Sequence, residues 1–200
     1  AAAALKDGGI EGWWIPQYVA DAHPEIKTID DALARPDLFP SVENKKRGVI
    51  YGCPSGWVCQ ITTAQAFKAW DAKKKGFDLK DPGSAAGLDG AIAKSYQRQE
   101  PWLGYYWAPT SILGKYKMVK LDAGVPFDQA EWDRCNSQAR CADPKKNDWS
   151  KSEVVTVVTD NFKKSGGDAN EYLSKRAWGN DTVNQLLAWM SDNQATGEDG

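Results

Sequence analysis

Short apolar runs alternate with helical patterns along this chain of 200 residues, and no other feature constrains the fold as strongly. Strands that alternate with helices at this spacing predict an α/β layer structure. Strands are expected at the start of 12–24, at 49–51, within 101–109, at 117–121 and at 153–160, the last as a buried strand rich in valine. Helices are expected at the end of 12–24 and over 28–39, 62–76, 84–100 and 181–193.

Capping residues set the expected helix boundaries. Thr28 or Asp30 is the expected N-cap of the second helix, and Thr62 or Thr63 that of the third, which should end at Gly76. The last helix is predicted from apolar residues at i, i+3, i+4 and i+7, namely Val183, Leu186, Leu187 and Met190. Residues 122–149 contain several prolines and are expected to be loop-like.

Charge and composition exclude some classes of partner. The formal net charge is −2 and 42% of the residues are hydrophobic, so neither nucleic acid nor an anionic membrane surface is an expected partner. No apolar run approaches the length of a membrane-spanning helix, and residues 1–14 lack the order of a secretion signal. The length suits one large or two small domains.

Four cysteines form two pairs of equal spacing, Cys53 with Cys59 and Cys135 with Cys141. His23 is the single histidine, and zinc ligands usually have shorter spacings with histidine support, so two local disulfides are favoured over a metal site. Each bridge would stabilise the fold by roughly 2 kcal/mol and indicates an oxidising compartment. Four reduced, unrelated cysteines are the alternative.

Catalytic machinery has little support in the sequence. His23 stands beside a proline and is not paired by any motif with a serine or cysteine, and oxidised cysteines are poor nucleophiles. The sequence contains no phosphate-binding glycine loop, zinc-protease motif or nucleophile elbow. No catalytic residue, metal or cofactor is therefore predicted.

Tryptophan is strongly enriched, with ten among 200 residues. Trp57 lies between two cysteines just after the strand at 49–51, and Trp107 lies at the end of an aromatic strand. Ligands of open α/β sheets bind outside the carboxyl ends of the strands, so these two rings could line one crevice, joined by Trp13 or Trp14. Rings around a pocket suit a quaternary ammonium ion, which cannot donate hydrogen bonds. The alternative is that Trp57 and Trp107 are core residues.

Three motifs carry a resemblance to a known family: "EGWWIPQYV", "GCPSGWVCQ" and "EPWLGYYWAPT". Together they resemble the substrate-binding proteins of ABC importers for glycine betaine, proline betaine, choline and trimethylamine N-oxide. The resemblance implies a type II periplasmic-binding-protein fold, with Trp57 and Trp107 as walls of an aromatic box. It also implies that the N–H groups of Val58 and Cys59 hold the ligand's carboxylate, and that Cys53 and Cys59 form a bridge across this loop. The pair Cys135 and Cys141 is expected to be a structural staple.

The chain departs from the family pattern before Gly12, where no segment matches the one that builds most of the other lobe. We therefore expect a ligand-binding lobe over 12–150, and a return crossing with C-terminal helices of a partial second lobe over 151–200. Half a pocket, with weak or no binding by this chain alone, is the expectation.

The resulting hypothesis is a non-enzymatic, periplasmic or membrane-tethered binding component of an importer, with a methylated amine as ligand and a membrane permease as partner. An aromatic-platform carbohydrate-binding module would instead show aromatic residues along a flat β-face. A hydrolase would need a nucleophile paired with a base, and His23 is the sole histidine.

Overall fold

The computed structural model describes residues 3–199, which form two compact units. The larger unit consists of residues 11–106 and 116–150. The smaller unit consists of 107–115 together with the described residues before 11 and after 150. The chain thus passes between the units at 10–11, 106–107, 115–116 and 150–151.

A five-stranded sheet contains β1 (Ile10–Pro16), β2 (Gly48–Tyr51), β3 (Phe77–Lys80), β4 (Gly104–Ala108) and β5 (Met118–Lys120). The strand order is β3-β2-β4-β1-β5. Strand β2 is parallel to β3 and to β4, whereas β1 is antiparallel to β5. In register, Gly48 lies opposite Phe77 and Tyr51 opposite Gly104. The strands expected near 12, at 49–51, within 101–109 and at 117–121 are confirmed, while β3 was not predicted.

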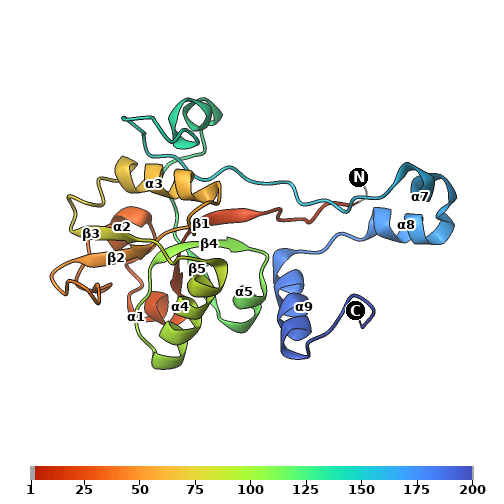
Figure 1. Ribbon diagram of the computed structural model, residues 1–200, viewed down its shortest axis with the longest axis horizontal. Helices are drawn as coiled ribbons and strands as arrows, with labels where there is room; N and C mark the ends of the chain where they lie inside the picture. The colour runs from red at the N-terminus through yellow and green to blue at the C-terminus, as the bar shows by residue number, and fades with distance from the viewer. Residues whose placement is uncertain (1–2, 200) are drawn as a thin grey trace. The chain divides into compact units, whose positions relative to one another are not determined.

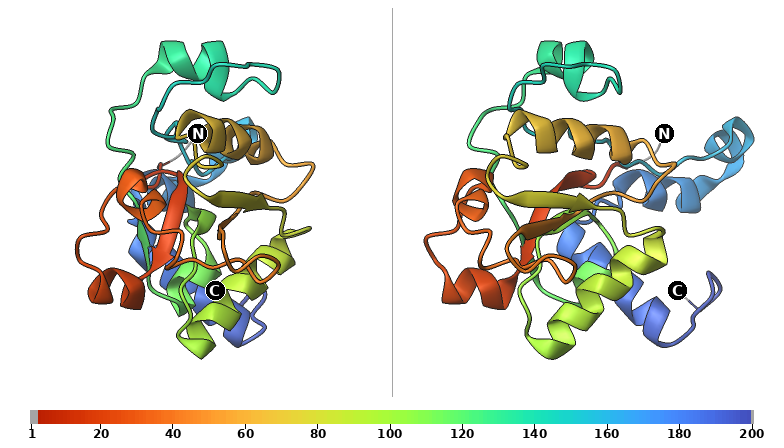
Figure 2. Two further views of the ribbon diagram at one scale, coloured as in Figure 1. Left: turned by 90° about the vertical axis from the view of Figure 1, so that its left-hand side faces the viewer. Right: turned by 60° about the vertical axis from the view of Figure 1, so that its left-hand side comes forward.

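Four helices belong to the larger unit ahead of β5: α1 (Gln17–Ala22), α2 (Ile29–Leu33), α3 (Cys59–Ala69) and α4 (Ala85–Arg98). Helices α3 and α4 lie on opposite faces of the sheet (Figures 1 and 2). Helix α3 connects β2 to β3 on one face of the sheet, and α4 connects β3 to β4 on the other face. Thr28 caps α2 and forms a capping box with Asp31, which confirms one of the two expected caps.

Helix α3 begins earlier than the sequence predicts. Its first residue is Cys59, so Thr62 and Thr63 lie inside the helix and neither is the N-cap. The Thr62 hydroxyl donates instead to the carbonyl of Cys59 at 3.2 Å, within the first turn. The helix ends at Ala69, ahead of Gly76, which has a φ of 93° just before β3. Gly76 therefore ends the turn after the helix rather than the helix itself.

Three tryptophans form the centre of the larger unit's core on the α3 side. Trp13 of β1 contacts Trp70 and Trp149, with ring centroids 6.2 and 6.1 Å away, and Trp70 stacks on Trp149. All three side chains are buried. On the α4 side, Leu88 and Ile92 are fully buried. Tryptophan thus supplies much of this core, because each ring buries a large apolar area.

The segment after β5 is loop-like, as expected, but contains two short helical elements. Helix α6 covers Gln129–Glu131 and runs into a π-helical turn at Trp132–Asn136. This turn contacts α3 and holds the first cysteine of the second pair.

The smaller unit contains α5 (Ser111–Lys115), α7 (Asp160–Ser165), α8 (Gly167–Lys175) and α9 (Asn180–Asp192). Helix α9 confirms the helix expected at 181–193, but its buried residues are Asn180, Asn184 and Ala188, and Leu186 of the predicted apolar face is exposed. Close packing explains the difference, because Gly114 of α5 lies against Asn184 and Ala188. The backbone N–H of Thr110 donates to the Asn184 side chain at 2.7 Å.

The buried strand expected at 153–160 is wrong. This segment makes isolated antiparallel bridges with residues near the N-terminus, Ala4 with Val155 and Gly9 with Ser152. Val157 is 80% exposed. Within residues 3–199 it has no sheet to enter, so its valines are not buried despite their strand propensity. None of the helices over 3–199 is long and apolar enough to cross a bilayer.

Candidate functional site

The loop between β2 and α3 carries the first cysteine pair, and the structure joins Cys53 to Cys59 with a Cα–Cα distance of 5.7 Å. Cys59 is the first residue of α3, so the bridge ties the end of β2 to the start of the helix. Between the two cysteines, the N–H of Trp57 donates to the carbonyl of Pro54 at 3.3 Å. Gly56 has a φ of 88°, a conformation that favours glycine and lets the turn close.

The tryptophan of this loop lies at the surface above a buried bridge. The Trp57 side chain is 41% exposed and its neighbour Val58 is 80% exposed. Cys53 and Cys59 are both buried. The Trp57 ring is therefore partly exposed at the surface of this unit, and the disulfide beside it is buried.

Two backbone N–H groups at the start of α3 directly follow Trp57 in the chain. The N–H of Gln60 donates to Trp57 and that of Ile61 to Val58, whereas the N–H groups of Val58 and Cys59 have no acceptor among residues 3–199. The first N–H groups of a helix lack intrahelical partners and lie at its positive end. A carboxylate is the kind of group such donors bind.

A polar cluster that the sequence did not predict, Ser55, Asp81 and Gly83, links the loop to the end of β3. Asp81, just after β3, accepts a short hydrogen bond from the hydroxyl of Ser55 and another from the N–H of Gly83 at 2.8 Å. These bonds, first the one from Ser55, lower the pKa of Asp81 below its usual 3.8. A small cavity of about 220 Å³ lies beside Asp81, lined by Cys53 and Gln60 among others. The pairing joins residues 26 apart, which no local pattern indicates.

The remaining predicted aromatic residues occupy other positions. Trp13 is fully buried in the tryptophan core, and Trp14 is buried with its Nε1 donating to the carbonyl of Tyr106 at 2.9 Å. Trp107 is the penultimate residue of β4, is half-buried and belongs to the smaller unit. Trp57, Val58 and Cys59 are thus consecutive residues at the junction of the loop with α3, whereas Trp13 and Trp14 lie in the core.

A partly buried carboxyl in β1, that of Glu11, was also missed. Burial raises the pKa of Glu11 above its usual 4.5, although a hydrogen bond with Tyr105 opposes the shift. Burial and the nearby Glu11 raise the pKa of Tyr105 as well. Glutamate within a strand gives no signal in the sequence beyond an interruption of the apolar pattern.

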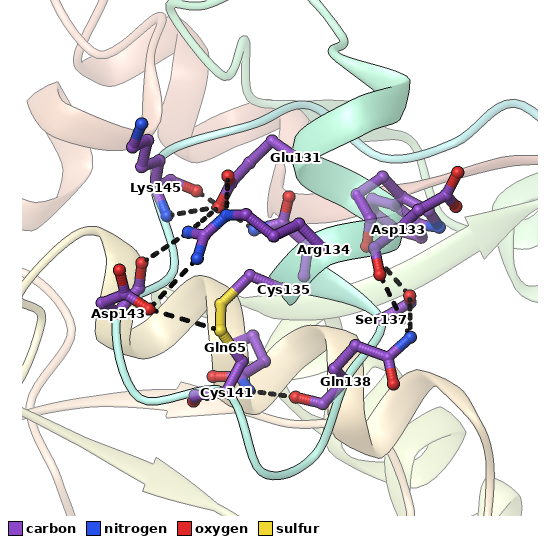
Figure 3. Close-up of a disulfide and its surroundings, with 12 residues drawn as sticks. Gln65, Glu131, Asp133, Arg134, Cys135, Ser137, Gln138, Cys141, Asp143 and Lys145 are labelled. Carbon is purple, nitrogen blue, oxygen red and sulfur yellow. Dashed lines mark hydrogen bonds and ion pairs between the residues drawn. A yellow bond between two sulfur atoms is a disulfide. The ribbon is translucent and has the colours of Figure 1, made fainter.

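The second pair, Cys135 with Cys141, is also a disulfide, with a Cα–Cα distance of 5.2 Å. Figure 3 shows the polar network around it, in which the Arg134 guanidinium contacts both Glu131 and Asp143. The side chain of Gln65 in α3 donates to the carbonyls of Cys141, at 3.0 Å, and Gln138. Both expected disulfides are thus confirmed.

The second disulfide includes two members of the one group of potential metal ligands in the described part of the chain. Cys135, Cys141 and Asp143 have ligand atoms within 4.8 Å of one another. Both sulfur atoms are bonded to each other, so neither is a thiolate that could bind a metal. The group is better described as a staple that fastens the loop to α3.

Comparison with known proteins decides the family. Residues 1–199 match the family described as the substrate-binding domain of the ABC-type glycine betaine transport system. The chain belongs to this family. It is a family of substrate-binding proteins rather than of enzymes, in agreement with the absence of catalytic motifs from the sequence.

Solved structures show the corresponding fold. The glycine betaine/L-proline-binding protein ProX from Borrelia burgdorferi has a TM-score of 0.54 at 20% identity, covering 98% of this chain and 61% of that one. An ABC-transporter choline-binding protein in complex with choline has a TM-score of 0.55 at 16% identity, covering 97% and 59%. The chain therefore spans about three fifths of the length of these proteins. The expected α/β, type II periplasmic-binding-protein-like class is confirmed.

Proposed function

We propose that this chain is part of the solute-binding component of an ABC importer and binds glycine betaine or a related methylated amine such as trimethylamine N-oxide. In this proposal the larger unit contains the ligand-binding lobe, and residues 151–199 contribute to the other lobe. The ligand-loaded protein would deliver its solute to a membrane permease. Two disulfides favour a location outside the cytoplasm, in a periplasm or tethered to the outer side of a membrane.

The observation that carries the proposal is the composition of the loop from Cys53 to Cys59. It presents the partly exposed Trp57 ring, followed in the chain by the N–H groups of Val58 and Cys59, which have no acceptor in the described part of the chain. A ring attracts a methylated cation without a hydrogen bond, with about 1–2 kcal/mol for each desolvated ring. The amides suit an anion. A zwitterion with both groups, such as a betaine, matches this pair of features.

Trp107 is proposed as a second wall of the aromatic box, on the basis of its motif at the end of β4. A cation enclosed by more than one ring gains from each, so loss of either ring should weaken binding. The burial of Trp13 and Trp14 supports a role for them in the core that supports β1 rather than as principal walls. The carbohydrate-module alternative is not favoured, because this family matches over almost the whole chain.

The test is Trp57→Ala in the full-length protein, with ligand binding measured by calorimetry. Glycine betaine affinity should fall by at least tenfold while the circular dichroism spectrum stays unchanged. Trp189→Ala is the matched control, because Trp189 is a comparably exposed tryptophan (49%) on α9. Betaine affinity in Trp57→Ala equal to that of the control would refute the assignment of Trp57 to the site.

A second test separates the two halves of the proposed site. Replacing Cys53 and Cys59 by serine frees the start of α3, so binding of carboxylate-bearing glycine betaine should weaken more than binding of choline, which lacks a carboxylate. The Cys135/Cys141 double serine variant controls for general loss of stability. Equal losses for both ligands in the first variant would show that its bridge is a staple only.

A further inference from the structure

A second attachment, separate from the disulfide, holds the loop that carries Trp57. The Ser55 hydroxyl donates to Asp81, and the Gln60 side-chain amide donates to the Ser55 hydroxyl at 3.1 Å. The same Gln60 amide accepts the N–H of Gly56 at 3.2 Å. A continuous series of hydrogen bonds therefore runs from Asp81 to the residue directly before Trp57.

The origin of this series is fixed to the sheet. Asp81 follows β3, and the adjacent Lys80 accepts the N–H of Gly52 at 2.8 Å, which extends the pairing of β2 with β3. The other carboxylate oxygen of Asp81 accepts the N–H of Gly83, a residue with a φ of 79°. Asp81 thus has both oxygens occupied and its backbone held by the end of a strand.

The middle of the loop lies at the surface, between the two cysteines of the disulfide. Residues 55–58 are exposed, and a Cβ placed on Gly56 would meet no described atom within 4 Å. The hydrogen bonds of Ser55 and Gln60 therefore hold the backbone of this turn in addition to the disulfide. A flexible turn would have to be ordered when ligand binds, and ordering rotamer-rich groups reduces affinity.

We propose that Asp81 is a positioning residue, which acts through Ser55 and Gln60 to hold the Trp57 turn in its ligand-binding conformation before ligand arrives. Only the predicted effect of Asp81 on ligand affinity rests on the proposed function. The effect of Asp81 on the conformation of the turn is expected in the ligand-free protein as well. Asp81 contacts the loop at Ser55 from the end of β3, so this contact constrains the backbone of the turn that carries Trp57.

The experiment uses full-length protein labelled with 5-fluorotryptophan, in which the Trp57 resonance is assigned by its loss in Trp57→Phe. In ligand-free Asp81→Ala and Ser55→Ala, this fluorine signal should shift or broaden while those of the buried tryptophans remain. Glycine betaine affinity should fall roughly 3- to 10-fold, the cost of ordering one or two side chains on binding. Asp81→Asn keeps one carbonyl oxygen and should lie between Asp81→Ala and wild type.

The matched control is Asp37→Ala. Asp37 is exposed and has a lowered pKa through hydrogen bonds from Arg35, so it resembles Asp81 in charge state, but its hydrogen-bonded side chain is Arg35 rather than a residue of the loop. An unchanged Trp57 signal in both Asp81→Ala and Ser55→Ala overturns the positioning role, whatever the ligand is. Wild-type betaine affinity in Asp81→Ala, when Trp57→Ala has lost binding, also overturns it. Unchanged betaine affinity in Trp57→Ala refutes the proposed function and leaves the fluorine test intact.

Discussion

Two adjacent tryptophans in β1 provide a matched test of hydrogen bonding in the core. Trp13 and Trp14 are both buried, at 0% and 8% exposure. The Nε1 of Trp14 donates to the carbonyl of Tyr106, whereas that of Trp13 has no partner among the described residues. Replacing each by phenylalanine removes the same atoms, so the cavity contributions are similar and the hydrogen-bond contributions differ. We predict that Trp14→Phe destabilises the protein more than Trp13→Phe, although Trp13 is the more deeply buried.

The expected difference follows from the two hydrogen-bonding environments. Trp14→Phe loses a buried hydrogen bond, at a net cost of about 0.5–1.5 kcal/mol. Trp13→Phe removes a buried donor without an acceptor, which relieves a penalty of about 1–3 kcal/mol and offsets part of its cavity cost. The free energy of unfolding of Trp14→Phe should therefore be lower than that of Trp13→Phe by about 2 kcal/mol or more. At this chain length, such a difference corresponds to roughly 4–8 °C in Tm.

Urea unfolding monitored by far-ultraviolet circular dichroism measures this difference directly, with the m-values compared to confirm that both variants unfold from similarly compact states. Leu88→Ala in α4 serves as a reference for loss of buried apolar contacts alone, because Leu88 is fully buried. If the two phenylalanine variants have equal midpoints, or if Trp13→Phe is the less stable, hydrogen bonding does not distinguish these positions and the reasoning is refuted.

Three further predictions concern pH, packing and capping. Burial raises the pKa of Glu11, so the stability that depends on its neutral form is fully present below pH 4.5 and is lost as the pH rises through the raised pKa. Glu11→Gln should therefore be more stable than wild type near neutral pH, and the difference in Tm between the two should close towards pH 4. A Cβ on Gly114 would lie 2.1 Å from the Asn184 carbonyl oxygen, so Gly114→Ala should destabilise the α5–α9 pair by about 1–3 kcal/mol in urea unfolding; hydrogen exchange in α9 as slow as in wild type would contradict this. Thr28→Ala should cost about 1 kcal/mol and Thr28→Ser much less, as measured by chemical denaturation, since serine retains the capping oxygen.

Local signals in the sequence predict most of the larger unit. The alternation of strands and helices, the Thr28 cap and the aromatic strand before Pro109 all appear in the structure. The failure at 153–160 has a different cause, because the β-propensity of valine indicates a strand only where a sheet is available to receive it. The start of α3 was misplaced because a disulfide, rather than a threonine cap, begins the helix.

Some features of the candidate site could also be predicted from the sequence, and others could not. Spacing of the cysteines indicates the bridge, and the motif around Trp57 indicates the family. The connection from Asp81 to Ser55 depends on the parallel pairing of β2 with β3, and β3 was not recognised in the sequence. Likewise, the apolar pattern of β1 gives no means to decide that Trp13 and Trp14 point into the core, because both rings suit a pocket and a core equally well.

The bridge from Cys53 to Cys59 also has a consequence for how this protein can diversify. Its sulfur atoms are buried, while the side chains at positions 55–58 face solvent. Substitutions at positions 57 and 58 therefore change the chemistry of an exposed surface with little penalty for the core beneath. In the proposed site, randomising residues 57 and 58 would therefore change ligand selectivity, while the tryptophan core and the sheet maintain the stability of the fold.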